Sequence, residues 1–388
     1  MHFMDFDNSR LKSQLSGERF TVVYELFGGE TECRATAREI CVEQTVEFPE
    51  SALPPGEIPD QILGRIEDFA ETGRGTWEAE ISYAVETAEC EFTQLLNVIF
   101  GNFSIKPGVR VSDIRLSPKL MATLKGPRFG IQGIRELLEE KDKPILFTAL
   151  KPLGLSSENF ANVIRTLAQN GIQIIKDDHG LADQVFSPFK ERVKLCGEAV
   201  RQAYEETGRR ALYVPNITAP FHQLRDRALY AKEHGAGGVM IAPGLVGLDA
   251  MKSIAEDDEI GLPVFSHPAF SGSYVVNQQG FTCRSYYGQL MRMAGADAVI
   301  YPNYGGRFSL SVEECVSIAE TCRGAMGHLR PSFVCPAGGM QLERIGDMLK
   351  NYGNDVMLLI GGGLFTCGVD LAENCRAFRD AVEEAVKG

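Results

Sequence analysis

The chain has 388 residues, of which 44% are hydrophobic and 23% are charged, and this ordinary globular composition excludes global disorder. Its 39 basic and 52 acidic residues give a net charge of −13, which argues against nucleic acid and anionic membranes as partners. It contains neither a run of about 18 apolar residues nor an apolar signal core in its first residues, and its ten cysteines include no CxxC pair, so we expect a cytoplasmic protein with reduced thiols.

Residues 1–125 predict a small α+β domain of the ferredoxin-like type. The segment Arg19–Phe27 has the composition of a strand, and residues 77–83 alternate between apolar and polar side chains as a half-buried strand does. Glu30–Glu43 has a helical pattern, and the apolar residues of CEFTQLLNVIF (90–100) recur close to helical spacing. This order of strands and helices favours an α+β arrangement.

Residues 126–388 predict a (β/α)8 barrel. Eight short apolar runs are each followed by a segment with a helical pattern. The runs are apolar on both faces of the predicted strand, as in a parallel sheet that is covered on both sides. Units of about 30 residues favour the closed barrel over an open sheet, and no GxGxxG follows the first run. The runs are ILFTALKP (145–152), IQIIKDD (172–178), ALYVPNI (211–217), GGVMIAP (237–243), LPVFSHP (262–268), DAVIYPN (297–303), SFVCPAGG (332–339) and VMLLIGGG (356–363).

Glycine pairs end the seventh and eighth runs. In barrels of this kind the active site lies at the carboxyl ends of the strands, and a phosphate site often lies in the last two loops. Glycine lets a backbone N–H approach an oxyanion closely and tolerates positive φ. We therefore interpret Gly338, Gly339, Gly362 and Gly363 as phosphate-binding positions. The alternative is that they only form tight turns between strand and helix.

The second run ends in Lys176, Asp177, Asp178 and His179. Charged groups gathered at a barrel mouth are costly unless they are paired or metal-bound, and oxygen-rich sites suit Mg²⁺. Lys176 and Asp178 share one strand face, and bending at the strand end would bring His179 to the same place. The alternative is a network of surface ion pairs.

Three further side chains stand at strand ends. Lys151 is a candidate acid/base, because neighbouring cations and apolar walls lower the pKa of a lysine; alternatively, it bridges to Asp178. His267 is a candidate ligand contact or a satisfied core histidine. Arg307 lies in YGGRFS, either a glycine-hinged loop that carries it toward an anion or an ordinary exposed loop. Together these residues predict a Mg²⁺-assisted enzyme that abstracts a proton beside the carbonyl of a phosphorylated compound.

The motifs resemble those of the ribulose-bisphosphate carboxylase (Rubisco) large-chain family, and more closely those of its non-carboxylating form IV Rubisco-like proteins. The family implies an N-terminal α+β domain, a barrel, and a homodimer, or a larger oligomer of dimers, in which the first domain of one chain completes the barrel site of another. The matching segments are GNF (101–103), KGPRFGIQG (125–133), ALKPLGLS (149–156), IIKDDHG (174–180), HP (267–268), YGGRF (304–308), AGGM (337–340) and IGGG (360–363).

The resemblance also implies roles for single residues. Lys151 matches the lysine that moves protons, and Lys176 matches the lysine that becomes a carbamate and binds Mg²⁺ with Asp178. Positions that match substrate contacts are Glu43, Asn102, His267, Gly338, Gly339, Gly362 and Gly363. His179 stands where the family has a glutamate as third metal ligand; since hard cations prefer oxygen, the Mg²⁺ is then weakly held, replaced by another divalent ion, or absent.

Departures from the carboxylases predict a different reaction. Leu153 and Arg307 stand in place of two active-site lysines, so we expect no CO₂ fixation. Pro268 and Ile300 stand where the carboxylases bind a second phosphate through an arginine and a histidine. We therefore expect a phosphorylated substrate with a single phosphate.

Three functions remain open from the sequence. The first is an enolase or isomerase acting on a monophosphorylated keto sugar, such as a methylthio-pentulose phosphate of methionine salvage. The second is carbon–carbon cleavage or decarboxylation of a phosphorylated branched oxo sugar acid, with Arg307 binding the carboxylate and His179 as the base. The third is a non-catalytic regulatory protein that has kept the fold.

Overall fold

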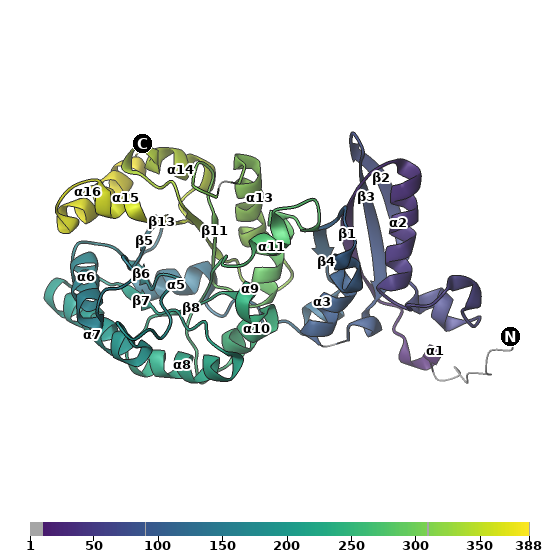
Figure 1. Ribbon diagram of the computed structural model, residues 1–388, viewed down its shortest axis with the longest axis horizontal. Helices are drawn as coiled ribbons and strands as arrows, with labels where there is room; N and C mark the ends of the chain where they lie inside the picture. Colours follow the sequence, from purple (N-terminus) through teal and green to yellow (C-terminus); the bar gives the residue numbers. More distant parts are fainter. Residues whose placement is uncertain (1–10, 90, 309, 388) are drawn as a thin grey trace. The chain divides into compact units, whose positions relative to one another are not determined.

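The computed structural model describes residues 11–89, 91–308 and 310–387. The chain forms two compact units (Figure 1). The first extends to Leu124 and includes Gly272–Tyr286, and the second consists of Lys125–Ser271 and Tyr287–Gly388.

The first unit is built on a mixed sheet of five strands in the order β10-β4-β1-β3-β2. Its central strand β1 pairs antiparallel with β3 and β4. The hydroxyl groups of Tyr24 and Tyr83 lie 2.8 Å apart on one face of the sheet, and Tyr24 donates to the carbonyl of Ile99 in α3 at 2.7 Å. Gln44, at the end of α2, donates to the carbonyls of Asn97 and Val98 at 2.7 and 2.9 Å. The two helices therefore lie side by side, as the ferredoxin-like prediction requires.

The elements of the first unit have the following bounds. The strands are β1 (Arg19–Phe27), β2 (Arg65–Gly73), β3 (Thr76–Ala84), β4 (Val109–Arg115) and β10 (Gly280–Phe281). The helices and helical turns are α1 (Leu11–Gln14), α2 (Glu30–Glu43), η1 (Glu50–Ala52), η2 (Ile58–Ile62), η3 (Val85–Thr87), α3 (Phe92–Phe100), η4 (Asn102–Ile105), α4 (Pro118–Met121) and α11 (Gly272–Val275).

One segment differs from the sequence-based division at residue 125. Gly272–Tyr286 lies in the chain after the fifth barrel strand, yet it packs in the first unit. There, β10 pairs in parallel with β4, with Gly280 opposite Arg110 and Phe281 opposite Val111. The N–H of Thr282 continues the pairing by donating to the carbonyl of Val111 at 2.9 Å. A strand of two residues leaves no periodic pattern in the sequence.

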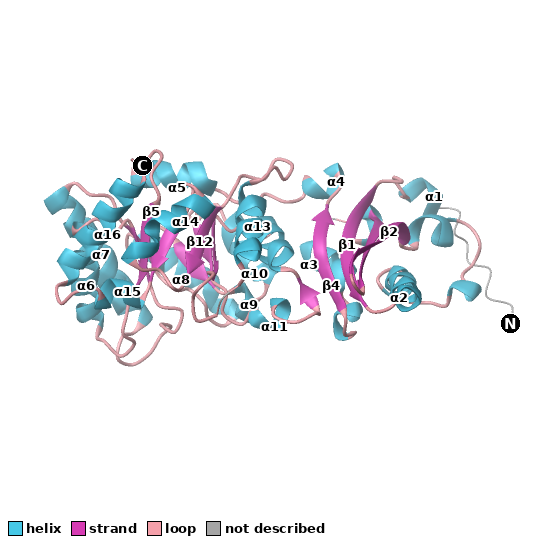
Figure 2. Ribbon diagram, turned by 90° about the horizontal axis from the view of Figure 1, so that it is seen from above, coloured by secondary structure: helices cyan, strands magenta, loops and turns pink. Residues whose placement is uncertain are grey.

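The second unit is a closed barrel of eight parallel strands, with helices around it (Figures 1 and 2). The sheet runs in the order β7-β6-β5-β13-β12-β11-β9-β8. Its ends join because Asn216, after β7, forms a parallel bridge with Met240 of β8. Two backbone hydrogen bonds of 2.9 Å, from Ile217 to Met240 and from Met240 to Pro215, seal this seam. The predicted barrel is therefore confirmed, with one strand in each of the eight runs.

The barrel elements have the following bounds. The strands are β5 (Ile145–Ala149), β6 (Ile174–Lys176), β7 (Leu212–Val214), β8 (Val239–Ile241), β9 (Val264–Ser266), β11 (Ala298–Pro302), β12 (Phe333–Ala337) and β13 (Met357–Ile360). The longer helices are α5 (Gly130–Leu138), α6 (Ser157–Gln169), α7 (Phe189–Thr207), α8 (Phe221–Glu233), α10 (Leu248–Glu256), α13 (Val312–Arg323), α14 (Ile345–Tyr352) and α16 (Leu371–Ala385). The short ones are α9 (Pro243–Val246), η5 (Arg284–Leu290), α12 (Met291–Met293), η6 (Leu342–Arg344) and α15 (Gly362–Thr366).

Large apolar side chains fill the interior of the barrel. They come from every strand and form one buried cluster, so the barrel is a packed core and not a channel. Polar chemistry is thus confined to the strand ends. Members of the cluster include Phe147, Ile174, Val214, Met240, Phe265, Ile300, Phe333, Cys335 and Met357. Among the described helices, none combines the length and the apolar character needed to cross a lipid bilayer.

Candidate active site

Lys176 is the last residue of β6 and lies under the barrel mouth. Its side chain is only 2% exposed, and Nζ donates to the carbonyl of Asp177 at 2.9 Å. Burial lowers the pKa of Lys176 to about 8, although the negative charges of Asp178 and Asp177 oppose this shift. A substantial fraction of this amine is therefore uncharged slightly above neutral pH.

Lys151 follows β5 and forms an ion pair across the mouth. Its Nζ lies 2.5 Å from Oδ2 of Asp178, and its side chain is 45% exposed. Burial of Asp178 would raise the pKa of that carboxyl, but hydrogen bonds from Lys151 and from the N–H of Gly180, with the charge of Lys176, bring the pKa below its usual value. The predicted surroundings of Lys151 therefore need correction: its closest partner is a carboxylate, as in the alternative interpretation.

Two histidines stack at the same place. The rings of His179 and His267 are parallel to within 17°, with centroids 4.7 Å apart. Nδ1 of His179 lies 3.3 Å from Oδ1 of Asp178. Nδ1 of His267 accepts the N–H of Ala269 at 3.1 Å, which assigns the ring proton to Nε2. Burial, followed by the charges of Lys176, His179 and Lys151, holds the pKa of His267 well below its usual value, so this ring is neutral near pH 7.

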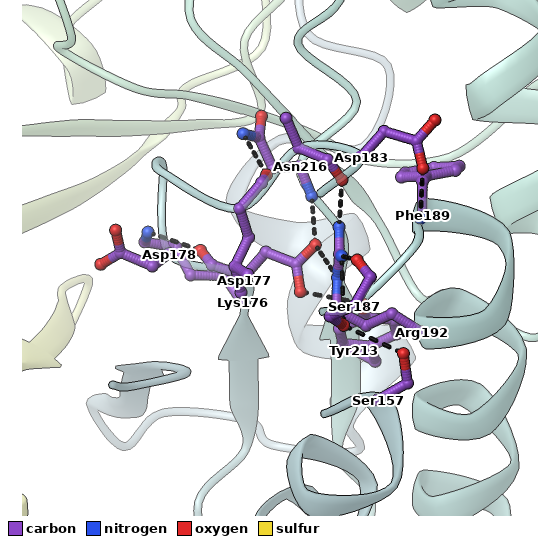
Figure 3. Close-up of polar contacts among 12 residues, drawn as sticks. Ser157, Lys176, Asp177, Asp178, Asp183, Ser187, Phe189, Arg192, Tyr213 and Asn216 are labelled. Carbon is purple, nitrogen blue, oxygen red and sulfur yellow. Dashed lines mark hydrogen bonds and ion pairs between the residues drawn. The ribbon is translucent and has the colours of Figure 1, made fainter. Parts of the chain in front are cut away.

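Asp177 points away from the mouth, into a buried network behind β6 (Figure 3). Its Oδ2 accepts from Nε of Arg192 at 3.2 Å and from the N–H of Asn216 at 3.0 Å. Its Oδ1 accepts from the hydroxyl of Tyr213 at 2.9 Å. Arg192 also donates to the carbonyls of Ser187 and Ala182, at 2.6 and 2.7 Å. The carboxylate of Asp177 is thus structural.

The sequence carries a signal for this network that a search of the strand ends misses. Arg192 lies on the apolar face of α7, one turn before Cys196 and two turns before Ala199, and all three are buried. A charged residue on such a face needs a buried partner, and a carboxylate at a neighbouring strand end is the natural one.

The described residues include no group of three histidine, cysteine, aspartate or glutamate side chains placed to hold a metal ion. Of the predicted ligands, Asp178 and His179 lie together, and Lys176 lies next to them as an amine. This donor set fits a divalent cation only if Lys176 supplies oxygen atoms in the form of a carbamate.

The loop after β12 turns through two glycines. Gly338 and Gly339 have φ values of +102° and +65°, which favour glycine. The carbonyl of Ala337 accepts the N–H of Asn303 at 2.9 Å, and that of Gly339 accepts from Arg344 at 2.8 Å. The parallel pairing of Ala337 with Leu359 directs the N–H of Gly338 toward the carbonyl of Leu359, whereas the N–H of Gly339 has no backbone acceptor within the described part of the chain. An N–H group left open at the end of a strand can bind an anion.

The three glycines after β13 are not equivalent. A Cβ on Gly361 or Gly362 would meet no atom within 4 Å, whereas one on Gly363 would lie 2.6 Å from the carbonyl oxygen of Met340. Gly361 and Gly362 therefore leave open space beside the backbone, while the packing against Met340 requires a glycine at position 363. The room for a Cβ does not test which N–H groups bind an anion, so the phosphate role of Gly362 and Gly363 stays a prediction.

Three other predicted residues make contacts of their own. Glu43 and Asn102 belong to the first unit, where Asn102 donates to Oε1 of Glu43 at 3.1 Å and both line a pocket of about 890 Å³. Arg307 is exposed, and its guanidinium lies over the ring of Phe308, 5.4 Å from the centroid. An exposed position fits both interpretations of this loop, so the role of Arg307 stays a prediction.

A family model described as "Ribulose bisphosphate carboxylase large chain, catalytic domain" matches residues 130–388. The 5-methylthioribulose-1-phosphate isomerase of Rhodospirillum rubrum is 35% identical over 369 residues, which cover 95% of this chain and 97% of that protein. The 2,3-diketo-5-methylthiopentyl-1-phosphate enolase of Bacillus pumilus is 32% identical over 326 residues, covering 83% and 80%. The crystal structure of a Rubisco-like protein from Rhodopseudomonas palustris has a TM-score of 0.86 and 37% identity, covering 94% and 98%.

We predict that Arg192→Met destabilises the protein by about 3–5 kcal/mol, because it leaves the carboxylate of Asp177 buried without its cation. Chemical denaturation measures this loss. Arg201→Met is the matched control, since Arg201 is exposed and pairs only with Glu198 and Glu205 on the surface of α7. Arg201→Met should lower the free energy of unfolding by less than about 1 kcal/mol. Equal losses for the two variants would show that the buried network is dispensable.

We predict that Lys176→Met stabilises the protein near pH 7. The folded state binds the Lys176 proton less tightly than the unfolded chain, so charging this amine opposes folding below pH 8 and ceases to do so as the pH rises toward 10.5. The gain should be about 3 kcal/mol near pH 7 and fall to about 1 kcal/mol near pH 9.5. Denaturation of both proteins at the two pH values measures it. A gain that does not depend on pH would show that the buried charge of Lys176 is not its cause.

Proposed function

This chain belongs to the ribulose bisphosphate carboxylase large-chain family, and from that premise we propose its function. We propose that the protein is a Rubisco-like enolase or isomerase that acts on a monophosphorylated keto sugar and does not fix CO₂. The observation that carries the proposal is the Lys151–Asp178 pair, 2.5 Å long, next to buried Lys176 and neutral His267. The names of the Rhodospirillum and Bacillus relatives, each specifying one phosphate, support a methylthio-pentulose phosphate of methionine salvage as substrate.

Lys151 is the residue that moves the proton. Its amine is partly exposed at the mouth, and the hydrogen bond to Asp178 holds it in position; the amine acts as base in its neutral form. That amine removes the proton beside the substrate carbonyl and later returns it to a neighbouring carbon. Nε2–H of His267 donates to the oxygen on which negative charge develops.

The phosphate is held by backbone N–H groups at the ends of β12 and β13. Gly339 offers an N–H group without a backbone acceptor among the described residues, and Gly361 and Gly362 leave open space beside their own backbone. The place of a second phosphate has no cation: Ile300 is 1% exposed within the apolar core, and position 268 is a proline. This contrast supports a substrate with one phosphate.

Mg²⁺ fits this site if Lys176 becomes a carbamate; carbamate oxygens, Asp178 and His179 would then hold the ion. Bound there, it would polarise the substrate carbonyl and stabilise the enolate. The lowered pKa of Lys176 favours the uncharged amine that reacts with CO₂. The family resemblance further supports a homodimer, or an oligomer of dimers, in which Glu43 and Asn102 of one chain contact the substrate of another.

We predict that Lys151→Ala abolishes proton abstraction. Wild-type protein should exchange deuterium from solvent into the α-carbon of 5-methylthioribulose 1-phosphate, and the variant should do so about 10²–10⁴-fold more slowly. NMR follows the exchange, and Lys141→Ala, an exposed lysine outside the mouth, is the control. Undiminished exchange in Lys151→Ala would remove Lys151 from the reaction. Product analysis separates the two reactions: isomerisation gives one product of unchanged mass, whereas two fragments of the substrate would favour carbon–carbon cleavage.

We predict that Gly362→Ala keeps the fold but weakens substrate binding. The added methyl group meets no protein atom within 4 Å, so it would stand in space that we assign to the phosphate. KM should rise about tenfold or more, which corresponds to about 1.4 kcal/mol. Gly346→Ala is the matched control, because this exposed helical glycine is equally free of contacts. Unchanged KM in Gly362→Ala would place the phosphate elsewhere.

A further inference from the structure

Arg344 joins the two loops that follow β11 and β12. It is the last residue of η6, and its side chain reaches back over the loop that precedes it. Nη1 donates to the carbonyl of Gly339 at 2.8 Å, and Nη2 donates to the carbonyl of Tyr304 at 3.2 Å. One guanidinium thus holds the end of the glycine turn after β12 against the turn after β11.

The two turns are shaped around this guanidinium. A Cβ on Gly339 would lie 2.8 Å from Nη1 of Arg344, and a Cβ on Gly305 would lie 2.9 Å from the same atom. Both glycines have positive φ, +65° and +71°. A side chain at either position would therefore crowd the guanidinium, and one at Gly339 would also meet the carbonyl oxygen of Gly305 at 2.6 Å.

A third contact of the guanidinium is with an aromatic ring. The guanidinium lies 5.1 Å from the centroid of the Tyr304 ring, within the range of a cation–π contact. The hydroxyl of Tyr304 donates to Asp347 at 3.0 Å and accepts from Asn351 at 2.8 Å, and both partners belong to α14. Since α14 directly follows Arg344 in the chain, the arginine and the ring that it covers are held by one helix.

Asp347 of α14 binds the hydroxyl of the Tyr304 ring that the guanidinium covers. Among the described residues, Arg344 itself forms no ion pair within 4.0 Å with this or another carboxylate. Its hydrogen bonds go to carbonyl oxygens, which satisfy donors but leave the positive charge in place. This charge lies beside the turn in which the N–H of Gly339 has no backbone acceptor among the described residues.

We propose that Arg344 is a positioning residue for the phosphate site: by holding the Gly339 carbonyl it fixes the orientation of the glycine turn, and its charge favours the anion bound there. The inference rests on the phosphate site of the proposed function and deepens it. The planar fork of arginine can bind two carbonyls at once, which the single ammonium of a lysine does less well. Charge alone therefore does not replace Arg344.

Calorimetric titration of the full chain with inorganic phosphate tests this role. Arg344→Ala and Arg344→Lys should each weaken phosphate binding about tenfold or more, the loss of about 1.4 kcal/mol. Millimolar guanidinium should restore binding in Arg344→Ala, and methylammonium should not. Arg330→Ala is the control, because Arg330 also donates to a backbone carbonyl, that of Arg128, outside the mouth. It should bind phosphate as wild type does.

Three results would overturn the inference: unchanged affinity in Arg344→Ala, full affinity in Arg344→Lys, or no rescue by guanidinium in a folded Arg344→Ala protein. If Arg344→Ala fails to fold, Arg344→Lys still shows whether phosphate binding needs the planar guanidinium or only a positive charge at this position. Gly362→Ala separates this inference from the proposed function. Weakened phosphate binding in Gly362→Ala but not in the Arg344 variants refutes only the role of Arg344, whereas absent binding in wild type refutes the phosphate site and with it this inference.

Discussion

The buried contact between Asp177 and Arg192 determines what the barrel mouth can contain. Because strand residues alternate, anchoring Asp177 behind β6 directs Lys176 and Asp178 toward the mouth. Asn216 extends the same network: its N–H binds Asp177, and its side chain donates to the carbonyl of His179 at 3.1 Å. The structural carboxylate of Asp177 therefore orients Lys176, Asp178 and Asn216. The bend after β6 then brings the ring of His179 against that of His267.

The acid–base character of the mouth follows from unequal burial. Lys176 lies deep in the barrel and has a pKa of about 8, whereas Lys151 stays partly exposed beside a carboxylate. His267 is kept neutral by burial and by the nearby lysines. The site thus brings together three kinds of group. Lys176 is an amine that can lose its charge, Lys151 and Asp178 form an ammonium–carboxylate pair, and His267 is a neutral hydrogen-bond donor. Such a set suits proton transfer beside a carbonyl.

Sequence reasoning finds what repeats and misses what depends on single contacts. All eight barrel strands follow from apolar runs, and β1 and α2 have the predicted bounds. Strand β10 has only two residues, too few to show the alternation of apolar and polar side chains that marks a strand in a sequence. Arg344 carries no signal because its partners are backbone carbonyls, which every sequence has. The glycine run 361–363 shows that backbone freedom is needed, but only the position of the Met340 carbonyl shows which glycine is open. The pairing of Lys151 with Asp178 is only one of two possibilities in the sequence, since its distance depends on two neighbouring strands.

The mouth is chemically asymmetric, and the asymmetry follows from the barrel core. At the ends of β12 and β13, backbone N–H groups and Arg344 favour negative charge. At β11, Ile300 continues the apolar packing of Phe265 and Phe333, so a charged side chain there would lie against hydrocarbon and would be costly to bury. Under the proposed function, the isoleucine at position 300 leaves the end of β11 without a cation and also completes the core. A ligand with an anion at one end and an uncharged group at the other suits this proposal, and a bisphosphate does not.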